Sequence, residues 1–137
     1  MDKLSVENVK QMQPLVLAQI GDAVQTLFVR EYVARKWGVK VNKMNRLVSS
    51  VVCAGSQFNT FKLIESELLE DEQDIANRAR NTHIHSKAKN FSYTQYIYAT
   101  ALEALIGYLY LTEKQDRLKT VLELSLKNID LEILNKK

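Results

Sequence analysis

Two carboxylates stand alone within the two most apolar stretches of the chain. From Pro14 to Val29 every residue except Asp22 is apolar or uncharged, and from Ser92 to Thr112 the only charged residue is Glu103. A carboxylate in apolar surroundings is costly unless a cation or hydrogen-bond donors meet it. Two such acids converging on one point would supply oxygen ligands for Mg²⁺, which typically takes one or two protein carboxylates and keeps several waters. The alternative is that each acid bonds a buried arginine, tyrosine or backbone group.

Small residues accompany both acids. Gly21 adjoins Asp22, and Gly107 lies one helical turn after Glu103. Such residues would let two helices approach closely and bring both carboxylates near one site. A metal held there can activate water and stabilise the charge that develops in phosphodiester hydrolysis. Spacing alone leaves the catalytic and the structural interpretation open.

Basic residues gather between the two acidic stretches. No acid occurs between Asp74 and Glu103, while the interval contains a cluster of cations and two histidines: Arg78, Arg80, His83, His85, Lys87 and Lys89. A loop of this composition can bind a phosphate backbone electrostatically, or it can be a solvated surface. The histidines lack a companion His/Cys cluster, so they predict no metal site. A second basic group allows the same two interpretations: Arg35, Lys36, Lys40, Lys43 and Arg46.

The elements that must position these residues are expected to be helices. One proline and four glycines favour helices over a turn-rich β fold, and no stretch predicts a strand. Helices are expected over 14–36, with Val16, Ile20, Val24 and Leu27 inward, and over 42–54. Gly55 is expected to end the second helix and Ser56 to cap a third, reaching Leu68. Further helices are expected over 71–79, after a Ser92–Gln95 capping box, and from Leu118 to Ile133, with a loop over 81–91.

Composition limits the class of protein. Residues 1–137 predict one all-α domain, with 46% hydrophobic and 26% charged residues. A single cysteine, Cys53, excludes an intrachain disulfide and suits a reducing compartment. The N-terminal residues lack the layout of a signal peptide, and neither apolar stretch is typical of a membrane span. A cytoplasmic protein that does not bind membranes is expected.

Three segments together resemble the ribonuclease III catalytic domain. IGDAV at 20–24 resembles the core of the signature helix of that family, and LEALIGYLYL at 102–111 resembles its second acidic motif. NRARNTHIHSKAKN at 77–90 is similar to the basic RNA-contacting loop of the stand-alone Mini-III type, which has no double-stranded-RNA-binding domain. The resemblance covers nearly the whole chain. It implies a helical homodimer that cleaves double-stranded RNA with Mg²⁺, for which Mn²⁺ can substitute. It also implies maturation of large-subunit (23S) ribosomal RNA precursors, with a ribosomal protein on the substrate as a further partner.

The resemblance assigns roles to particular residues. Asp22 and Glu103 match the two acids that are catalytic and bind the metal. The residues matched to RNA binding are Arg78, Arg80, Asn81, His83, Lys87 and Lys89. Ala18 and Thr100 stand where the family usually has Glu and Asp, which leaves the number of metal ions open. The alternatives are a non-catalytic helical RNA-binding protein whose metal site has decayed, and an interaction protein with no RNA role.

Overall fold

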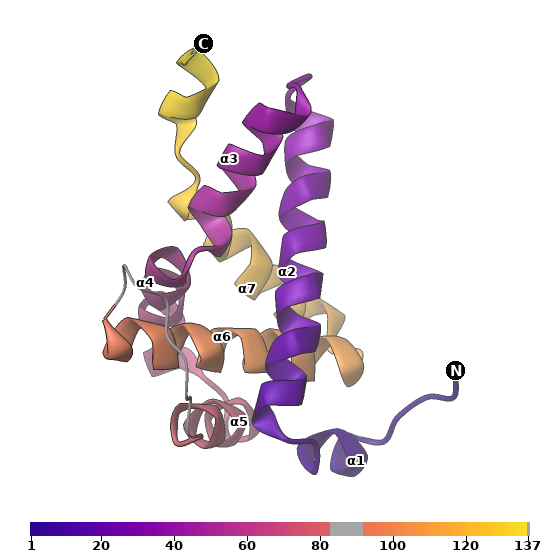
Figure 1. The fold of residues 1–137 in the computed structure, drawn as a ribbon. Coiled ribbons are helices and arrows are strands. Elements are labelled where there is room, and N and C mark those ends of the chain that lie inside the picture. Colours follow the sequence, from indigo (N-terminus) through magenta and orange to yellow (C-terminus); the bar gives the residue numbers. More distant parts are fainter. Residues whose placement is uncertain (83–91, 137) are drawn as a thin grey trace.

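The computed structural model describes residues 1–82 and 92–136, and all regular structure in these ranges is helical (Figure 1). The α-helices are α1 (Val6–Lys10), α2 (Pro14–Lys36), α3 (Val41–Val52), α4 (Ala54–Ile64), α5 (Glu70–Arg80), α6 (Tyr93–Leu111) and α7 (Gln115–Ser125). The 3-10 helices are η1 (Glu65–Glu67), η2 (Leu126–Asn128) and η3 (Leu131–Asn135). The all-α fold class expected from the sequence is confirmed. Most of the loop expected over 81–91 lies outside the described residues.

The two apolar stretches are α2 and α6, and they cross at the centre of the fold (Figure 1). Their backbones touch at Gly21 and Gly107. A Cβ added to Gly21 would lie 1.7 Å from the backbone oxygen of Glu103, and one added to Gly107 would lie 2.1 Å from that of Leu17. No side chain fits in either place, so the two glycines set the separation of the helices.

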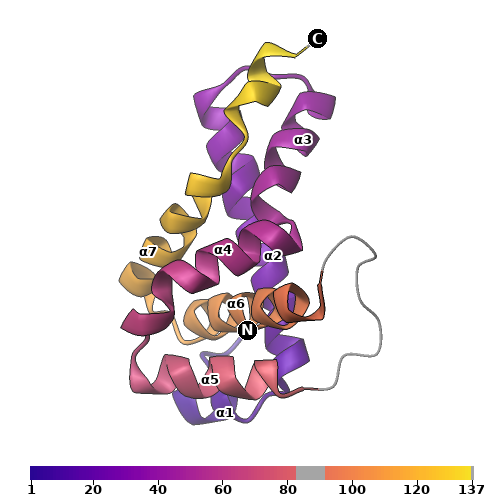
Figure 2. The same cartoon turned by 90° about the vertical axis from the view of Figure 1, so that its left-hand side faces the viewer.

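A large core surrounds α6. Every α6 residue from Ala99 to Leu109 is buried except Glu103, which is partly buried. Helices α4 and α5 pack along α6, and α1 lies below them beside α5 (Figure 2). Full burial of a large apolar side chain contributes about 1.5–3 kcal/mol, so this core holds α6 firmly in place.

A second, smaller core lies farther along α2. The C-terminal half of α2 packs there with α3 and the C-terminal segment, which together form the upper part of the molecule in Figure 2. Val29, Val33, Leu47 and Val51 are fully buried, and Ile133 covers them from the C-terminal side. Helix α2 therefore spans both cores, with Asp22 on the part of the helix that meets α6.

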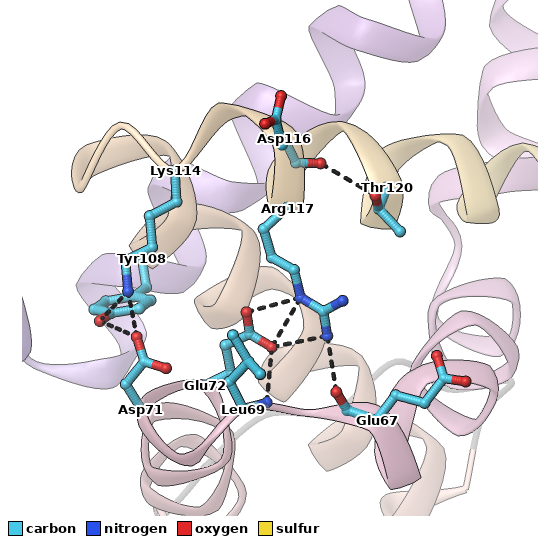
Figure 3. Close-up of polar contacts among 9 residues, drawn as sticks. All are labelled: Glu67, Leu69, Asp71, Glu72, Tyr108, Lys114, Asp116, Arg117 and Thr120. Carbon is cyan, nitrogen blue, oxygen red and sulfur yellow. Dashed lines mark hydrogen bonds and ion pairs between the residues drawn. The ribbon is translucent and has the colours of Figure 1, made fainter.

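Polar contacts fasten the start of α5 to the turn between α6 and α7 (Figure 3). Asp71 accepts hydrogen bonds from Lys114 and from the hydroxyl of Tyr108, the latter at 2.6 Å. The fully buried Glu72 accepts hydrogen bonds from Arg117 at 2.9–3.1 Å. Burial would raise the pKa of Asp71, but the hydrogen bonds from Lys114 and Tyr108 outweigh it and lower that pKa to about 2. These five residues form the polar junction of the fold.

The expected limits of α2 and α6 are confirmed because local signals set them. Pro14 begins α2, as its missing N–H permits at the first position of a helix. Ser92 caps α6: its hydroxyl accepts from the N–H of Gln95 at 3.1 Å, and its own N–H donates to the Gln95 side chain at 3.4 Å. A serine and a glutamine three residues apart therefore identify this helix start correctly.

The expected inward face of α2 is wrong in part. Val16 and Leu27 are 47% and 67% exposed, whereas Ala18, Gly21 and Gln25 are buried against the rest of the fold. The helix is apolar on nearly every side, so apolar periodicity cannot select the face that meets α6. The close contact at the glycines selects it instead.

The expected junction between the second and third helices is also wrong. Helix α4 begins at Ala54 with Cys53 as its N-cap, so Gly55 and Ser56 lie within its first turn. The hydroxyl of Ser56 does not cap the helix, because it donates to the backbone oxygen of Ser50 at 2.5 Å. The third helix also ends as an α-helix at Ile64 and continues only as the short η1.

The last helix is shorter than expected. It ends at Ser125, and the chain from there to Asn135 contains the two short 3-10 helices instead. Asn128 donates to Thr60 on α4 at 2.9 Å, and the N–H of Asp130 donates to Ser50 on α3 at 3.0 Å. These contacts with other elements hold the segment in a path that one continuous helix could not follow.

Candidate active site

The crossing of α2 and α6 brings Asp22 and Glu103 together. Asp22 follows Gly21, and Gly21 faces the backbone of Glu103. Asp22 is exposed, while Glu103 is partly buried. Burial raises the pKa of Glu103 to about 8, with a further rise from the negative charge of Asp22 and from a hydrogen bond between the two side chains. Two acids from separate helices thus share one place on the surface, where both cannot be negatively charged without cost.

Neither carboxylate has a cationic partner in the described ranges 1–82 and 92–136. All ion pairs there involve other acids, such as Asp71 with Lys114 and Glu72 with Arg117. The neutral amide of Gln57 is the group that lowers the pKa of Glu103, through a hydrogen bond. A pair of carboxylates that repel each other, open to solvent on one side, fits a divalent cation.

The two positions that lack the usual acids are buried. Ala18 is 7% exposed and Thr100 is 6% exposed, and the hydroxyl of Thr100 donates to the backbone oxygen of Tyr96 at 3.0 Å. Among the residues that the structure describes, no group of three or more His, Cys, Asp or Glu side chains can hold a metal ion. The described part of the chain therefore offers two carboxylates at this place.

Two further residues at the site were not predicted from the sequence. Gln25 and Gln57 are fully or almost fully buried, and the amide of Gln57 donates to the side-chain oxygen of Gln25 at 2.9 Å. Gln25 lies one turn after Asp22 on the same side of α2, which is the signal that could have identified it. Gln57 lies on α4, and only the tertiary fold brings it to Glu103.

Two residues predicted to bind RNA are engaged inside the protein. The guanidinium of Arg78 donates to the backbone oxygens of Lys10 at 2.5 Å and Met12 at 3.3 Å. Arg80 donates to the hydroxyl of Tyr98 at 3.1 Å and to Asn77 at 2.6 Å.

The other predicted RNA-binding residues lie at and beyond the end of α5. Asn81 follows the last residue of α5 and is exposed. His83, Lys87 and Lys89 lie outside the described residues. The structure therefore brings the two predicted acids together, while Arg78 and Arg80 bond groups within the protein.

Known proteins are similar to this chain in sequence and in fold. A family model described as the ribonuclease III domain matches residues 15–114. Mini-ribonuclease 3 of Staphylococcus aureus is 40% identical over 124 residues, which are 89% of this chain and 92% of the relative. Mini-ribonuclease 3 of Thermoanaerobacter is 40% identical over 127 residues, with 93% and 89% covered. An X-ray structure of a Fusobacterium nucleatum protein superposes with a TM-score of 0.78 at 32% identity, covering 85% of this chain and 93% of that one.

The chain belongs to the ribonuclease III domain family. It is an endoribonuclease of the ribonuclease III type, a class that acts on double-stranded RNA and uses a divalent metal ion. In the described part of the chain, no helix is long and apolar enough to cross a membrane.

Proposed function

We propose that Asp22 and Glu103 hold Mg²⁺, or Mn²⁺ in its place, and that this site hydrolyses the phosphodiester bonds of double-stranded RNA. The observation that supports the proposal is the pair of facing carboxylates, which forms no ion pair within the described residues. A divalent cation bound there would supply activation of water and stabilisation of the charge on the phosphate.

The residues of the chain prepare the site for this chemistry. The contacts at Gly21 and Gly107 fix the backbones from which the two acids project. Burial raises the pKa of Glu103 to about 8, so at neutral pH a cation must displace a proton from the pair. Ala18 and Thr100 contribute no carboxylate, which leaves positions on the cation for water and for a phosphate oxygen.

The test is cleavage of long duplex RNA over a range of Mg²⁺ concentrations. Asp22→Asn and Glu103→Gln keep the shape of each side chain but remove its charge, and each is expected to lower the rate by roughly a thousandfold or more. Asp71→Asn is the matched control, because it removes an acid that already has a cationic partner. Comparable losses in all three folded variants would refute the assignment of the site.

We also propose that Asn81, His83, Lys87 and Lys89 contact the RNA backbone. Duplex RNA is recognised mainly by shape and by its phosphates and 2′-hydroxyls, which these side chains can bind. Arg78 and Arg80 already bond groups within the protein, so we assign them to holding α5 in place.

Affinity over a salt series tests this contact. Removing both lysines by Lys87→Ala with Lys89→Ala should weaken binding to many duplex sequences and reduce the salt slope by roughly 2. The inactive Asp22→Asn background prevents cleavage during the measurement. An unchanged slope would remove the lysines from the interface.

The exposed face of α2 supports a homodimer. Val16 and Leu27 lie along one side of the helix, and Leu15 beside them is 41% exposed. Apolar surface of this kind favours a second copy related by two-fold symmetry, the commonest closed arrangement. Light scattering should give a dimer mass, and Leu27→Glu should shift it toward the monomer. A monomeric wild-type protein at micromolar concentration would exclude this assembly.

We propose precursors of large-subunit (23S) ribosomal RNA as the natural substrate, acted on in the cytoplasm, with a ribosomal protein bound to the RNA. The resemblance of the basic segment to the Mini-III type supports this choice. Sequencing the ends of 23S ribosomal RNA after depletion of the protein tests it. Fully matured ends in the depleted cells would contradict it.

A further inference from the structure

Gln25 and Gln57 form a buried amide pair beside the two acids. Their side chains are 0% and 3% exposed, and they join α2 to α4 through a hydrogen bond of 2.9 Å. Burying an amide is unfavourable unless its donors and acceptors are satisfied, and apolar side chains would fill the same volume at lower cost. In the described part of the chain the amide nitrogen of Gln25 has no hydrogen-bond partner. The pair is therefore poorly suited to stabilising the core.

The direction of the hydrogen bonds links this pair to Glu103. The side-chain nitrogen of glutamine carries two hydrogens and is its only side-chain donor. In Gln57 it donates to the oxygen of Gln25 at 2.9 Å, and Gln57 also meets the carboxyl group of Glu103, whose pKa it lowers. If the amide of Gln57 were turned over, its oxygen would face the oxygen of Gln25 and the carboxylate together. The oxygen of Gln25 thus holds the nitrogen end of the Gln57 amide in place.

We propose that Gln57, held in orientation by Gln25, is a positioning residue that fixes the Glu103 carboxylate beside Asp22 for cation binding. The inference rests on the proposed function of the two acids. Groups that hydrogen-bond a metal ligand orient it, and their loss typically weakens metal binding by about 10–100-fold. At a site with only two carboxylates, the orientation of each has a large share in the affinity.

The experiment measures Mn²⁺ binding to the RNA-free protein by titration calorimetry, with stability followed by urea unfolding. Gln57→Met keeps the length of the side chain but removes the amide, and it should raise the Mn²⁺ dissociation constant by about tenfold or more. Gln25→Met leaves Gln57 in place but removes its hydrogen-bond partner. This variant should raise the Mn²⁺ dissociation constant by a smaller factor. Thr60→Val is the matched control, since Thr60 is a buried polar residue of the same helix that bonds Ser56 and Asn128 instead.

A second readout separates positioning from chemistry. Single-turnover cleavage by Gln57→Met should return close to the wild-type rate at saturating metal, because both carboxylates remain. An unchanged dissociation constant in Gln57→Met would overturn the inference, as would an equal change in Thr60→Val. If Gln57→Met does not fold, an unchanged constant in Gln25→Met overturns it in the same way.

The failure of the proposed function gives a different result. Mn²⁺ binding that survives Asp22→Asn and Glu103→Gln would remove the cation from this site altogether. Binding that depends on both acids but not on either glutamine would leave the proposed function intact and refute only the positioning role.

Discussion

Helix α6 is held at two places, and the two places treat their acids in opposite ways. At the crossing with α2, Asp22 and Glu103 face each other with no ion pair inside the described ranges, and the pKa of Glu103 is raised. At the polar junction, Lys114 and Arg117 meet the acids directly, and the pKa of Asp71 is lowered.

Asp71 and Glu72 are therefore neutralised by neighbouring cations, whereas the acids at the crossing meet no cation in the described ranges and avoid mutual repulsion by holding a proton. Acids without a cationic partner do not stabilise the fold, so the contrast supports the proposal that the crossing binds a cation.

The largest effect is expected when the crossing itself is broken. Gly21→Ala places a methyl group against the backbone of Glu103, and the helices must separate to admit it. Overpacking of this kind should lower the free energy of unfolding by about 3 kcal/mol or more, with loss of cleavage. Urea unfolding measures the change in the free energy of unfolding. Gly38→Ala is the matched control, because nothing lies within 4 Å of the Cβ it would add. Equal stabilities of the two variants would show that the glycines do not set the helix separation.

A smaller loss is expected at the polar junction. Glu72→Gln removes the charge that meets Arg117, and it leaves a buried amide in a place built for a carboxylate. Removing one partner of a buried pair costs about 3–5 kcal/mol, but Arg117 is 27% exposed and can reach water, so roughly 2 kcal/mol is expected. Cleavage per folded molecule should persist. A variant that kept full stability but lost activity would place this acid in the chemistry.

A third comparison concerns the sign of the pH dependence of stability. The folded-state pKa of Glu103, about 8, lies above its ordinary value of 4.5, so its contribution to stability is complete below pH 4.5 and disappears as the pH rises through 8. The pKa of Asp71, about 2, lies below 3.8, so its contribution is present above pH 3.8 and disappears as the pH falls toward 2.

Urea unfolding of the metal-free protein from pH 3 to 9, at one protein concentration, measures the pH dependence of stability that each acid contributes. Glu103→Gln should remove the loss of stability on the alkaline side and leave the acid side unchanged. Asp71→Asn should do the reverse. Identical profiles for wild type and Glu103→Gln would mean that the pKa of Glu103 is not raised in solution.

The sequence predicted those features that local chemistry determines. Pro14 and the Ser92–Gln95 pair act within a few residues of the helix starts that they set, so both starts were predicted correctly. The isolation of Asp22 and Glu103 in apolar stretches, with glycines nearby, was enough to predict that the two helices approach closely.

Features that depend on long-range packing were not predictable in this way. Ser56 has the residue type of a helix cap, but its hydroxyl finds a backbone oxygen from the preceding helix. Composition showed that Arg78 is a cation but not that it turns toward the backbone of residues 10 and 12. Gln57 meets Glu103 only after α4 has packed on α6, so no spacing along the chain could reveal it.

Direct backbone contact at the crossing makes the distance between the two carboxylates depend on side-chain length. Neither helix can move closer, because the glycines already touch the opposite backbone, and α6 cannot easily retreat from its core. Asp22→Glu therefore keeps the charge but advances the carboxylate by one methylene that the backbone cannot compensate. The short acid on α2 and the longer one on α6 are in this sense a matched pair of lengths, and exchanging them would keep the summed length while moving the place where the two carboxyl groups meet.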